Sequence, residues 1–157
     1  MDLTGLIQIF TGFLGSLGFS ILFNIRGRKL WVASLGGLIS WTIFLLLEPV
    51  FQGEASRYFF AAAAVTVYSE VFARVLKPPT TTFLVSSIVP LIPGGSLYYT
   101  MNYALNEQWD LFVQKAFSTL ELALALAVGI IAITTLTRMQ TALRRKLKSP
   151  EFHTIIH

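Results

Sequence analysis

Long apolar blocks separated by short polar stretches dominate this chain. Most blocks are close to the ~20 residues that an α-helix needs to cross a bilayer. They predict an all-α integral membrane protein with about five transmembrane helices. We expect these helices at residues 3–23, 30–47, 58–73, 80–105 and 111–137, followed by a basic tail at 138–157. With short loops between the helices, residues 1–157 form a single membrane domain and leave no room for a separate soluble one.

The first block is predicted to be a retained helix rather than a signal peptide. It is too long and too rich in glycine and serine for a signal-peptide core. Asp2 is the only charged residue before Arg26, so the positive segment that opens a signal peptide is missing.

Small residues recur at helical spacing in two of the blocks. Gly12, Ser16 and Ser20 lie on one face of the first helix, and Ala125 and Gly129 lie on one face of the last. Small-residue faces let membrane helices approach closely. We therefore expect these two faces to contact helices beyond the chain's own.

The fourth block is interrupted near its middle by Pro90 and by Pro93-Gly94-Gly95. Proline removes a backbone donor and clashes with the preceding turn, while glycine adds backbone freedom. Together they predict a helix that is broken rather than merely bent. The fifth block, at ~1.5 Å per residue, is ~40 Å long and exceeds the ~30 Å hydrocarbon core, so tilt or protrusion is expected.

Composition excludes several classes of protein. Hydrophobic residues make up 54% of the 157 residues and charged residues only 13%, against ~25% charged in soluble domains. The net charge of +4 comes from short stretches between apolar blocks, which does not indicate nucleic-acid binding. With no cysteine, disulfides, Cys-ligated zinc and thiol catalysis are excluded. We expect no cofactor or metal site, and no predicted helix contains the histidine that an intramembrane enzyme would need.

The distribution of Lys and Arg predicts the orientation. Ten lie on one side of the five predicted helices and two on the other, and the rule that positive loops stay inside places the ten in the cytoplasm. The N-terminus is then outside and the C-terminus inside. The two outer residues are Arg57 and Lys115. The ten are Arg26, Arg28, Lys29, Arg74, Lys77, Arg138, Arg144, Arg145, Lys146 and Lys148.

Three groups of residues, in this order and spacing, resemble the threonine/serine exporter family. The groups are Gly18-Phe19-Ser20-Ile21-Leu22-Phe23-Asn24 before a basic turn, Ser69-Glu70-x-x-Ala73-Arg74 with Pro79, and Pro90-Leu91-Ile92-Pro93-Gly94-Gly95 with Tyr98. The resemblance covers nearly the whole chain. In this family one long polypeptide or two separate subunits form the membrane core, and the chain most resembles the small subunit, which is equivalent to the C-terminal half of the single-chain members.

This resemblance implies a multi-pass protein of the bacterial plasma membrane that exports threonine and serine, or dicarboxylates such as succinate. It also implies a partner, the larger membrane subunit of the same family, with a soluble N-terminal region and helices of its own. A homo-oligomer is a further possibility, and the remaining contacts expected are lipid and a small carboxylate substrate.

The helix break is the first candidate substrate site. A broken helix exposes unpaired N–H groups at the start of its second half, and these attract an anion such as a carboxylate. Transporters commonly place substrate at such half-helix ends. The alternative is a kink packed against neighbouring helices, with tyrosines reaching the outer interface. The candidate substrate-binding residues are Pro93, Gly94, Gly95, Ser96 (as a cap or ligand), Tyr99 and Asn102.

Two carboxylates are candidates for proton coupling or gating. Glu121 sits ten residues into the fifth block, ~15 Å along the helix, where an intramembrane carboxylate is a functional hypothesis by default. The alternative is a protonated side chain bonded to a neighbouring helix, or a helix that slides outward. Glu70 lies near the cytoplasmic end of the third helix, and Arg74 at i+4 makes a simple ion pair the alternative to a gate or partner contact.

The sequence favours a subunit of a secondary exporter. Amino acids are favoured over dicarboxylates, because no Lys or Arg lies in a helix interior to meet a second carboxylate. The main alternative is a structural subunit that stabilises a larger partner, in which case the break should face a helix and not a cavity. We expect the basic tail to anchor the topology and touch anionic lipid. No role is expected for His153 or His157.

Overall fold

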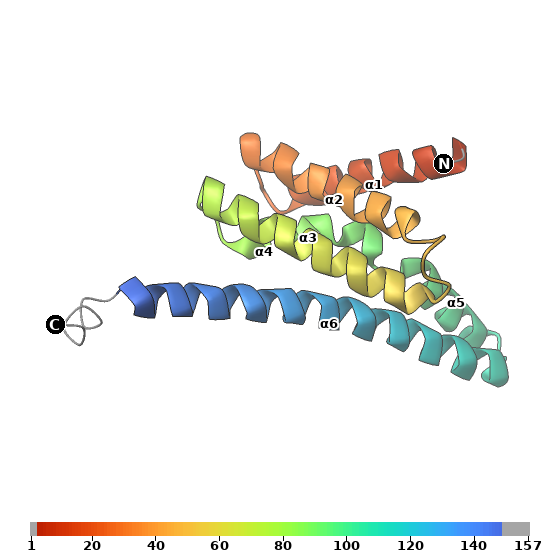
Figure 1. Ribbon diagram of the computed structural model, residues 1–157. Coiled ribbons are helices and arrows are strands. Elements are labelled where there is room, and N and C mark those ends of the chain that lie inside the picture. The colour runs from red at the N-terminus through yellow and green to blue at the C-terminus, as the bar shows by residue number, and fades with distance from the viewer. Residues whose placement is uncertain (1–2, 149–157) are drawn as a thin grey trace.

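The computed structural model describes residues 3–148, with side chains as far as Leu143, and within that range it is helical throughout (Figure 1). Figure 1 shows two bundled layers, with the long last helix lying along the outside of the others. The elements are α1 (Leu3–Leu22), α2 (Arg28–Leu46), α3 (Glu54–Leu76), α4 (Thr80–Ser87), the 3₁₀ turn η1 (Val89–Leu91), α5 (Gly94–Leu105) and α6 (Trp109–Lys148).

Residues 3–148 contain four helices long and apolar enough to cross a membrane, namely α1, α2, α3 and α6. The pair formed by α4 and the segment Val89–Leu105 is bent by 44° and makes a fifth if counted as one span. The expectation of an all-α membrane protein is therefore confirmed.

Two helices, α3 and α6, extend beyond the predicted ranges. α3 begins at Glu54 and ends at Leu76, several residues beyond the predicted 58–73 at both ends. α6 continues to Lys148, so residues 138–148 of the predicted tail are helical. Lys, Arg, Leu and Gln are good helix formers, and no Gly or Pro occurs between Arg138 and Pro150. Residues 149–157, with both histidines, and the side chains of residues 144–148 lie outside the described part.

The connections between helices gather at two ends of the molecule (Figure 1). The α1–α2 and α3–α4 connections lie at the left of Figure 1 together with the C-terminal end of α6. The start of α1, the α2–α3 connection and the α5–α6 connection lie at the right. The two basic connections and the basic end of α6 are therefore on the same side of the bundle, as the charge count requires.

Glycine and serine set the spacing of the inner helices. A Cβ at Gly37 of α2 would overlap Ser16 of α1, and one at Gly36 would overlap Ser87 of α4. Gly129 of α6 packs against the backbone of α3. A Cβ built at this glycine would lie only 2.6 Å from the Phe59 carbonyl oxygen. The two small-residue faces thus pack inside the chain, and our expectation that they mark contacts with other chains was wrong.

Inter-helix hydrogen bonds reinforce this packing. The hydroxyl of Tyr68 in α3 donates to the Val32 carbonyl of α2 at 2.8 Å, and Ser87 donates to the Ala33 carbonyl at 3.2 Å. Both bonds reach backbone carbonyls in mid-helix, which small neighbouring residues leave accessible. They tie α2 to α3 and α4 near the basic end.

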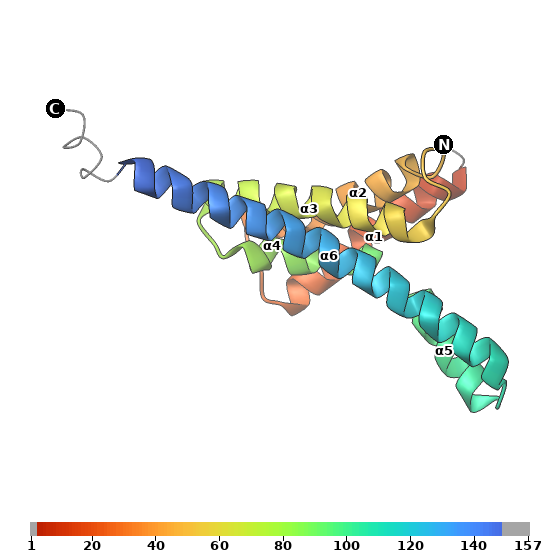
Figure 2. The same cartoon turned by 60° about the horizontal axis from the view of Figure 1, so that its bottom comes forward.

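A hairpin of α5 and the first turns of α6 projects from the bundle (Figure 2). The two helices pack on each other, and the hydroxyls of Thr100 and Thr119 are 3.1 Å apart across them. Apolar side chains such as Leu97, Met101 and Phe117 are exposed along the hairpin. The helix predicted at 111–137 is α6. It is longer than a bilayer is thick, as predicted, because its first part belongs to this hairpin.

Candidate functional site: the break between α4 and α5

The predicted break occurs at the predicted place. α4 ends at Ser87, η1 turns the chain over Val89–Leu91, and α5 starts at Gly94. The backbone hydrogen bonds change from the α-helical Ile88-to-Leu84 bond to the shorter-range bond from Leu91 N to Ile88 O at 2.8 Å. Pro90 and Pro93 cannot donate, so the helical ladder cannot run through this segment.

The start of α5 leaves two backbone donors without a partner. The amide of Gly94 donates to the Ile92 carbonyl at 2.6 Å, and that of Leu97 donates to the Pro93 carbonyl at 3.0 Å. The intervening N–H groups, of Gly95 and Ser96, have no acceptor within residues 3–148. They point along the axis at the positive end of the helix dipole, the arrangement that favours an anion.

Ser96 does not cap α5. The N-cap residue is Pro93, which has no side chain able to accept a hydrogen bond, and the structure has no side-chain cap there. Ser96 lies in the first turn of α5, and its carbonyl accepts a hydrogen bond from the Thr100 hydroxyl at 2.8 Å. Of the two predicted roles, cap or ligand, only the second is compatible with this position.

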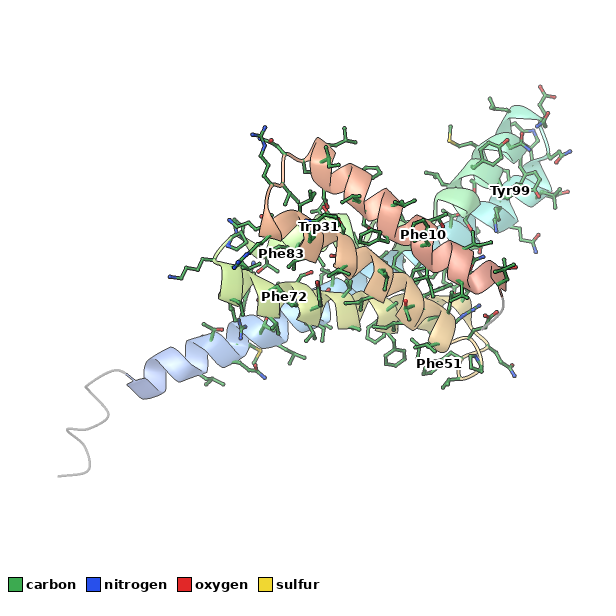
Figure 3. The ribbon with its side chains drawn as sticks, turned by 90° about the horizontal axis from the view of Figure 1, so that it is seen from above. Phe10, Trp31, Phe51, Phe72, Phe83 and Tyr99 are labelled. Atoms are coloured by element: carbon green, nitrogen blue, oxygen red, sulfur yellow. The ribbon has the colours of Figure 1, made fainter. Side chains whose placement is uncertain are left out.

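The glycine side of the break is open. No atom lies within 4 Å of the position that a Cβ would take at Gly94 or Gly95. Tyr99 is 51% exposed and lies on the projecting hairpin, away from the bundle (Figure 3). Asn102 is half-buried, and its side-chain oxygen accepts a hydrogen bond from Asn106 at 3.1 Å. The six candidates therefore line one stretch of α5, with Tyr99 and Asn102 one to two turns beyond the break.

The proline side of the break packs against the chain. The side chain of Pro90 lies against Gly12 of α1, and Trp41 of α2 approaches the same glycine. Beside it, a groove of about 260 Å³ opens between these elements. The indole N–H of Trp41 is buried and has no acceptor among the described residues. The residues that line the groove are Gln8, Thr11, Gly12, Gly15, Trp41, Val89 and Pro90.

The sequence prediction did not include this groove. Gln8 and Thr11 were polar positions in an apolar helix and could have been singled out on that ground. Trp41 could not, because tryptophan in a membrane helix ordinarily indicates an interfacial position. Its place in one groove with Pro90, some fifty residues away in sequence, depends on the tertiary fold.

Glu121 lies in the first half of α6. Its side chain is exposed on α6, although Ala125 on the same face lies beside the α3 core and Gly129 packs on α3 itself. At ~1.5 Å per residue, Glu121 is ~18 Å from the start of α6. Glu121 lies at the edge of the face that packs on α3, because the next residue, Leu122, is buried in the core cluster with α3. Its role in proton coupling or gating stays a prediction.

Glu70 forms the ion pair that its spacing suggested. Its Oε2 lies 3.7 Å from Nη2 of Arg74, one turn on in α3. The Glu70 side chain is 15% exposed and that of Arg74 54%. A groove of about 320 Å³ adjoins the pair, between α3 and the C-terminal half of α6. No group of three His, Cys, Asp or Glu residues that could hold a metal ion occurs in the described range.

Comparison with known proteins supports a transport function. Residues 8–136 match the family model described as "Threonine/Serine exporter, ThrE". No curated protein and no solved structure gives a significant match. The matched segment includes most of α1, all of α2 to α5 with the break, and most of α6. The chain therefore belongs to the threonine/serine exporter family.

Proposed function

We propose that this chain is a subunit of a secondary exporter for small carboxylate-bearing metabolites, with threonine and serine as its first substrates. The observation that carries the proposal is the start of α5. Two unpartnered backbone donors, of Gly95 and Ser96, stand there beside glycines with open space around them.

The electrostatic argument concerns how a carboxylate is held at depth. A carboxylate in a bilayer requires a positive partner, and residues 80–105 contain no Lys or Arg. Helix N-terminal amides carry partial positive charge without the cost of burying a full one. Gly94 and Gly95 also let a ligand approach the backbone, which a Cβ at either position would obstruct.

The open side of the break indicates a site that a second chain completes. Gly94, Gly95 and Tyr99 face away from the chain's own helices, and Glu121 is an exposed carboxylate on a helix of membrane-spanning length. An ionisable group facing lipid is costly. We propose that a larger membrane subunit of the same family covers these residues. The orientation we propose is N-terminus out and C-terminus in the cytoplasm, in a bacterial plasma membrane.

A structural subunit is the second candidate, and one observation favours it. The proline side of the break packs on α1 and α2, as expected for a kink that only fits neighbouring helices together. The open glycine side argues against it, because a purely structural break would bury both sides. A dicarboxylate exporter is the remaining alternative, and it differs from the first only in substrate.

The test is efflux from cells that express this chain with and without a neighbouring membrane gene of the same family. Cells are loaded with threonine or with succinate, and the release of each is followed. The proposal requires threonine release only when both chains are present. Threonine transport by the purified chain alone in liposomes would contradict the two-chain site, and succinate release without threonine release would establish the dicarboxylate alternative.

A further inference from the structure

A second polar groove lies between α3 and the C-terminal half of α6, and none of its lining residues belongs to the break. The groove there is about 320 Å³ in volume, at the lower end of the ~300–1,000 Å³ range of small-molecule sites. It lies towards the end where the basic connections gather, the end that the proposed orientation places in the cytoplasm. The residues that line it are Glu70, Arg74, Thr137, Arg138, Thr141 and Ala142.

The negative group of the groove is only partly satisfied. Glu70 is 15% exposed, yet its contact with Arg74, at 3.7 Å, is too long for a charge-assisted hydrogen bond, which spans ~2.7–2.9 Å. Glu70 makes no hydrogen bond within residues 3–148. A mostly buried carboxylate with spare lone pairs is costly unless a donor reaches it. A ligand ammonium is such a donor.

The positive groups come from two helices. Arg74 is on α3 and Arg138 is on α6, and Arg138 makes no ion pair among the described residues. A guanidinium fork matches a carboxylate in shape and charge. The groove therefore places a carboxylate acceptor and two carboxylate binders within one small volume.

Two hydroxyls add acceptors rather than donors. Thr137 donates its hydroxyl hydrogen to the Thr134 carbonyl at 3.0 Å, and Thr141 donates to the Thr137 carbonyl at 2.8 Å. With their hydrogens used, both oxygens retain lone pairs that accept from an N–H or O–H of a ligand.

We propose that this groove binds a zwitterionic hydroxy amino acid at the cytoplasmic entrance of the exporter, an inference that rests on the proposed function. The ligand's ammonium group lies at Glu70, its carboxylate at Arg138 and Arg74, and its hydroxyl at the threonines. A dicarboxylate or an inorganic anion fits less well. Its second negative charge would be repelled by the Glu70 carboxylate, and it has no ammonium group to donate hydrogen bonds to that carboxylate.

The test is equilibrium binding of radiolabelled threonine to the full chain in nanodiscs of zwitterionic lipid. The competitors are threonine, N-acetylthreonine, which lacks the ammonium, threonine methyl ester, which lacks the carboxylate, and inorganic phosphate. The variants are Glu70→Gln and Arg138→Gln, with Glu48→Gln and Lys115→Gln as controls. Glu48 makes the matching 3.7 Å ion pair, with Arg57, at the other end of the bundle.

Each charge should control recognition of one end of the ligand. Loss of a hydrogen bond to a charged group weakens threonine binding roughly tenfold or more. In the Glu70→Gln variant, N-acetylthreonine should compete as well as threonine does, because the partner of the ammonium group is gone. In the Arg138→Gln variant, the methyl ester should compete as well as threonine does. Both control variants should bind all ligands as the unmodified chain does. Arg138 is exposed, so its variant is expected to fold even if the Glu70 variant does not.

Four results would overturn the inference: no threonine binding by the unmodified chain, unchanged binding in both variants, an equal loss for all ligands in both, or displacement by phosphate as effective as by threonine. Failure of the proposed function is distinguishable, because it is read from efflux in cells. Efflux with no charge-specific binding refutes only the groove, and charge-specific binding without efflux refutes only the exporter.

Discussion

Gly129→Ala tests whether α6 is held against α3 by a contact that only glycine allows. The new Cβ would lie 2.6 Å from the Phe59 carbonyl oxygen, 3.1 Å from the Ala62 Cβ and 3.3 Å from the Ala63 nitrogen. Two of these are backbone atoms, so no rotamer change relieves the overlap. The helices must separate by roughly 0.8 Å to restore an ordinary contact of about 3.4 Å, and overpacking of this kind costs ~1–3 kcal/mol.

Alanine also has a benefit that the comparison must remove. It is favoured over glycine inside a helix by ~1 kcal/mol. Gly15→Ala and Gly18→Ala are matched controls, because no atom lies within 4 Å of a Cβ at either position of α1. We therefore expect the controls to be neutral or stabilised by up to ~1 kcal/mol, and Gly129→Ala to be less stable than they are by ~1–3 kcal/mol.

The assay is unfolding of the full chain in mixed micelles, followed by circular dichroism and by accessibility of a cysteine introduced on α6. Gly129→Ala should shift the unfolding midpoint towards milder conditions, and Gly15→Ala should not. If Gly129→Ala is as stable as Gly15→Ala, close packing of α6 on α3 does not hold the fold together, and the groove proposed between these helices loses its support.

Three further predictions follow from the same structure. A C-terminal alkaline phosphatase fusion should be inactive and a fluorescent fusion bright, because ten of twelve Lys and Arg residues lie on the predicted cytoplasmic side; an active phosphatase would overturn the orientation. Glu121→Gln should preserve assembly but weaken the dependence of efflux on the pH gradient, and unchanged dependence would leave Glu121 a structural residue. Tyr68→Phe should cost ~1 kcal/mol in the same unfolding assay through loss of its 2.8 Å bond to Val32, whereas an unchanged midpoint would mean that the bond contributes nothing net.

The all-helical membrane architecture and the break could be predicted from the sequence because both have local causes. Apolar length determines whether a segment can span a bilayer, and proline at 90 and 93 interrupts a ladder whatever surrounds it. Contacts between helices have no such local cause. The small-residue faces of α1 and α6 correctly indicated that another helix packs closely on each. Which helix that is depends on the fold.

The candidate site was predicted only in part for the same reason. The unpaired amides of α5 follow from the prolines and glycines, and the structure has them where expected. That Pro90 and Trp41 line one groove, and that Arg138 and Glu70 line another, depends on residues tens of positions apart. The exposure of Glu121 likewise depends on which face of α6 packs on α3, where Leu122 is buried and Glu121 is not, and not on its depth along the helix.

The most direct test of the account is threonine export by the double variant Gly94→Ala/Gly95→Ala. Both methyl groups have room within the chain, since no atom of another part of the chain lies within 4 Å of either position, so membrane insertion and folding should be retained. Co-purification with the larger subunit checks that the complex still assembles. The account predicts that export nevertheless falls well below that of the unmodified chain, because the methyl groups block a carboxylate from the amides of Gly95 and Ser96. Ser96→Ala should have a smaller effect, as one hydrogen bond is worth only ~1 kcal/mol. Export at the unmodified rate by a properly assembled double variant would contradict the account and leave the break as a kink.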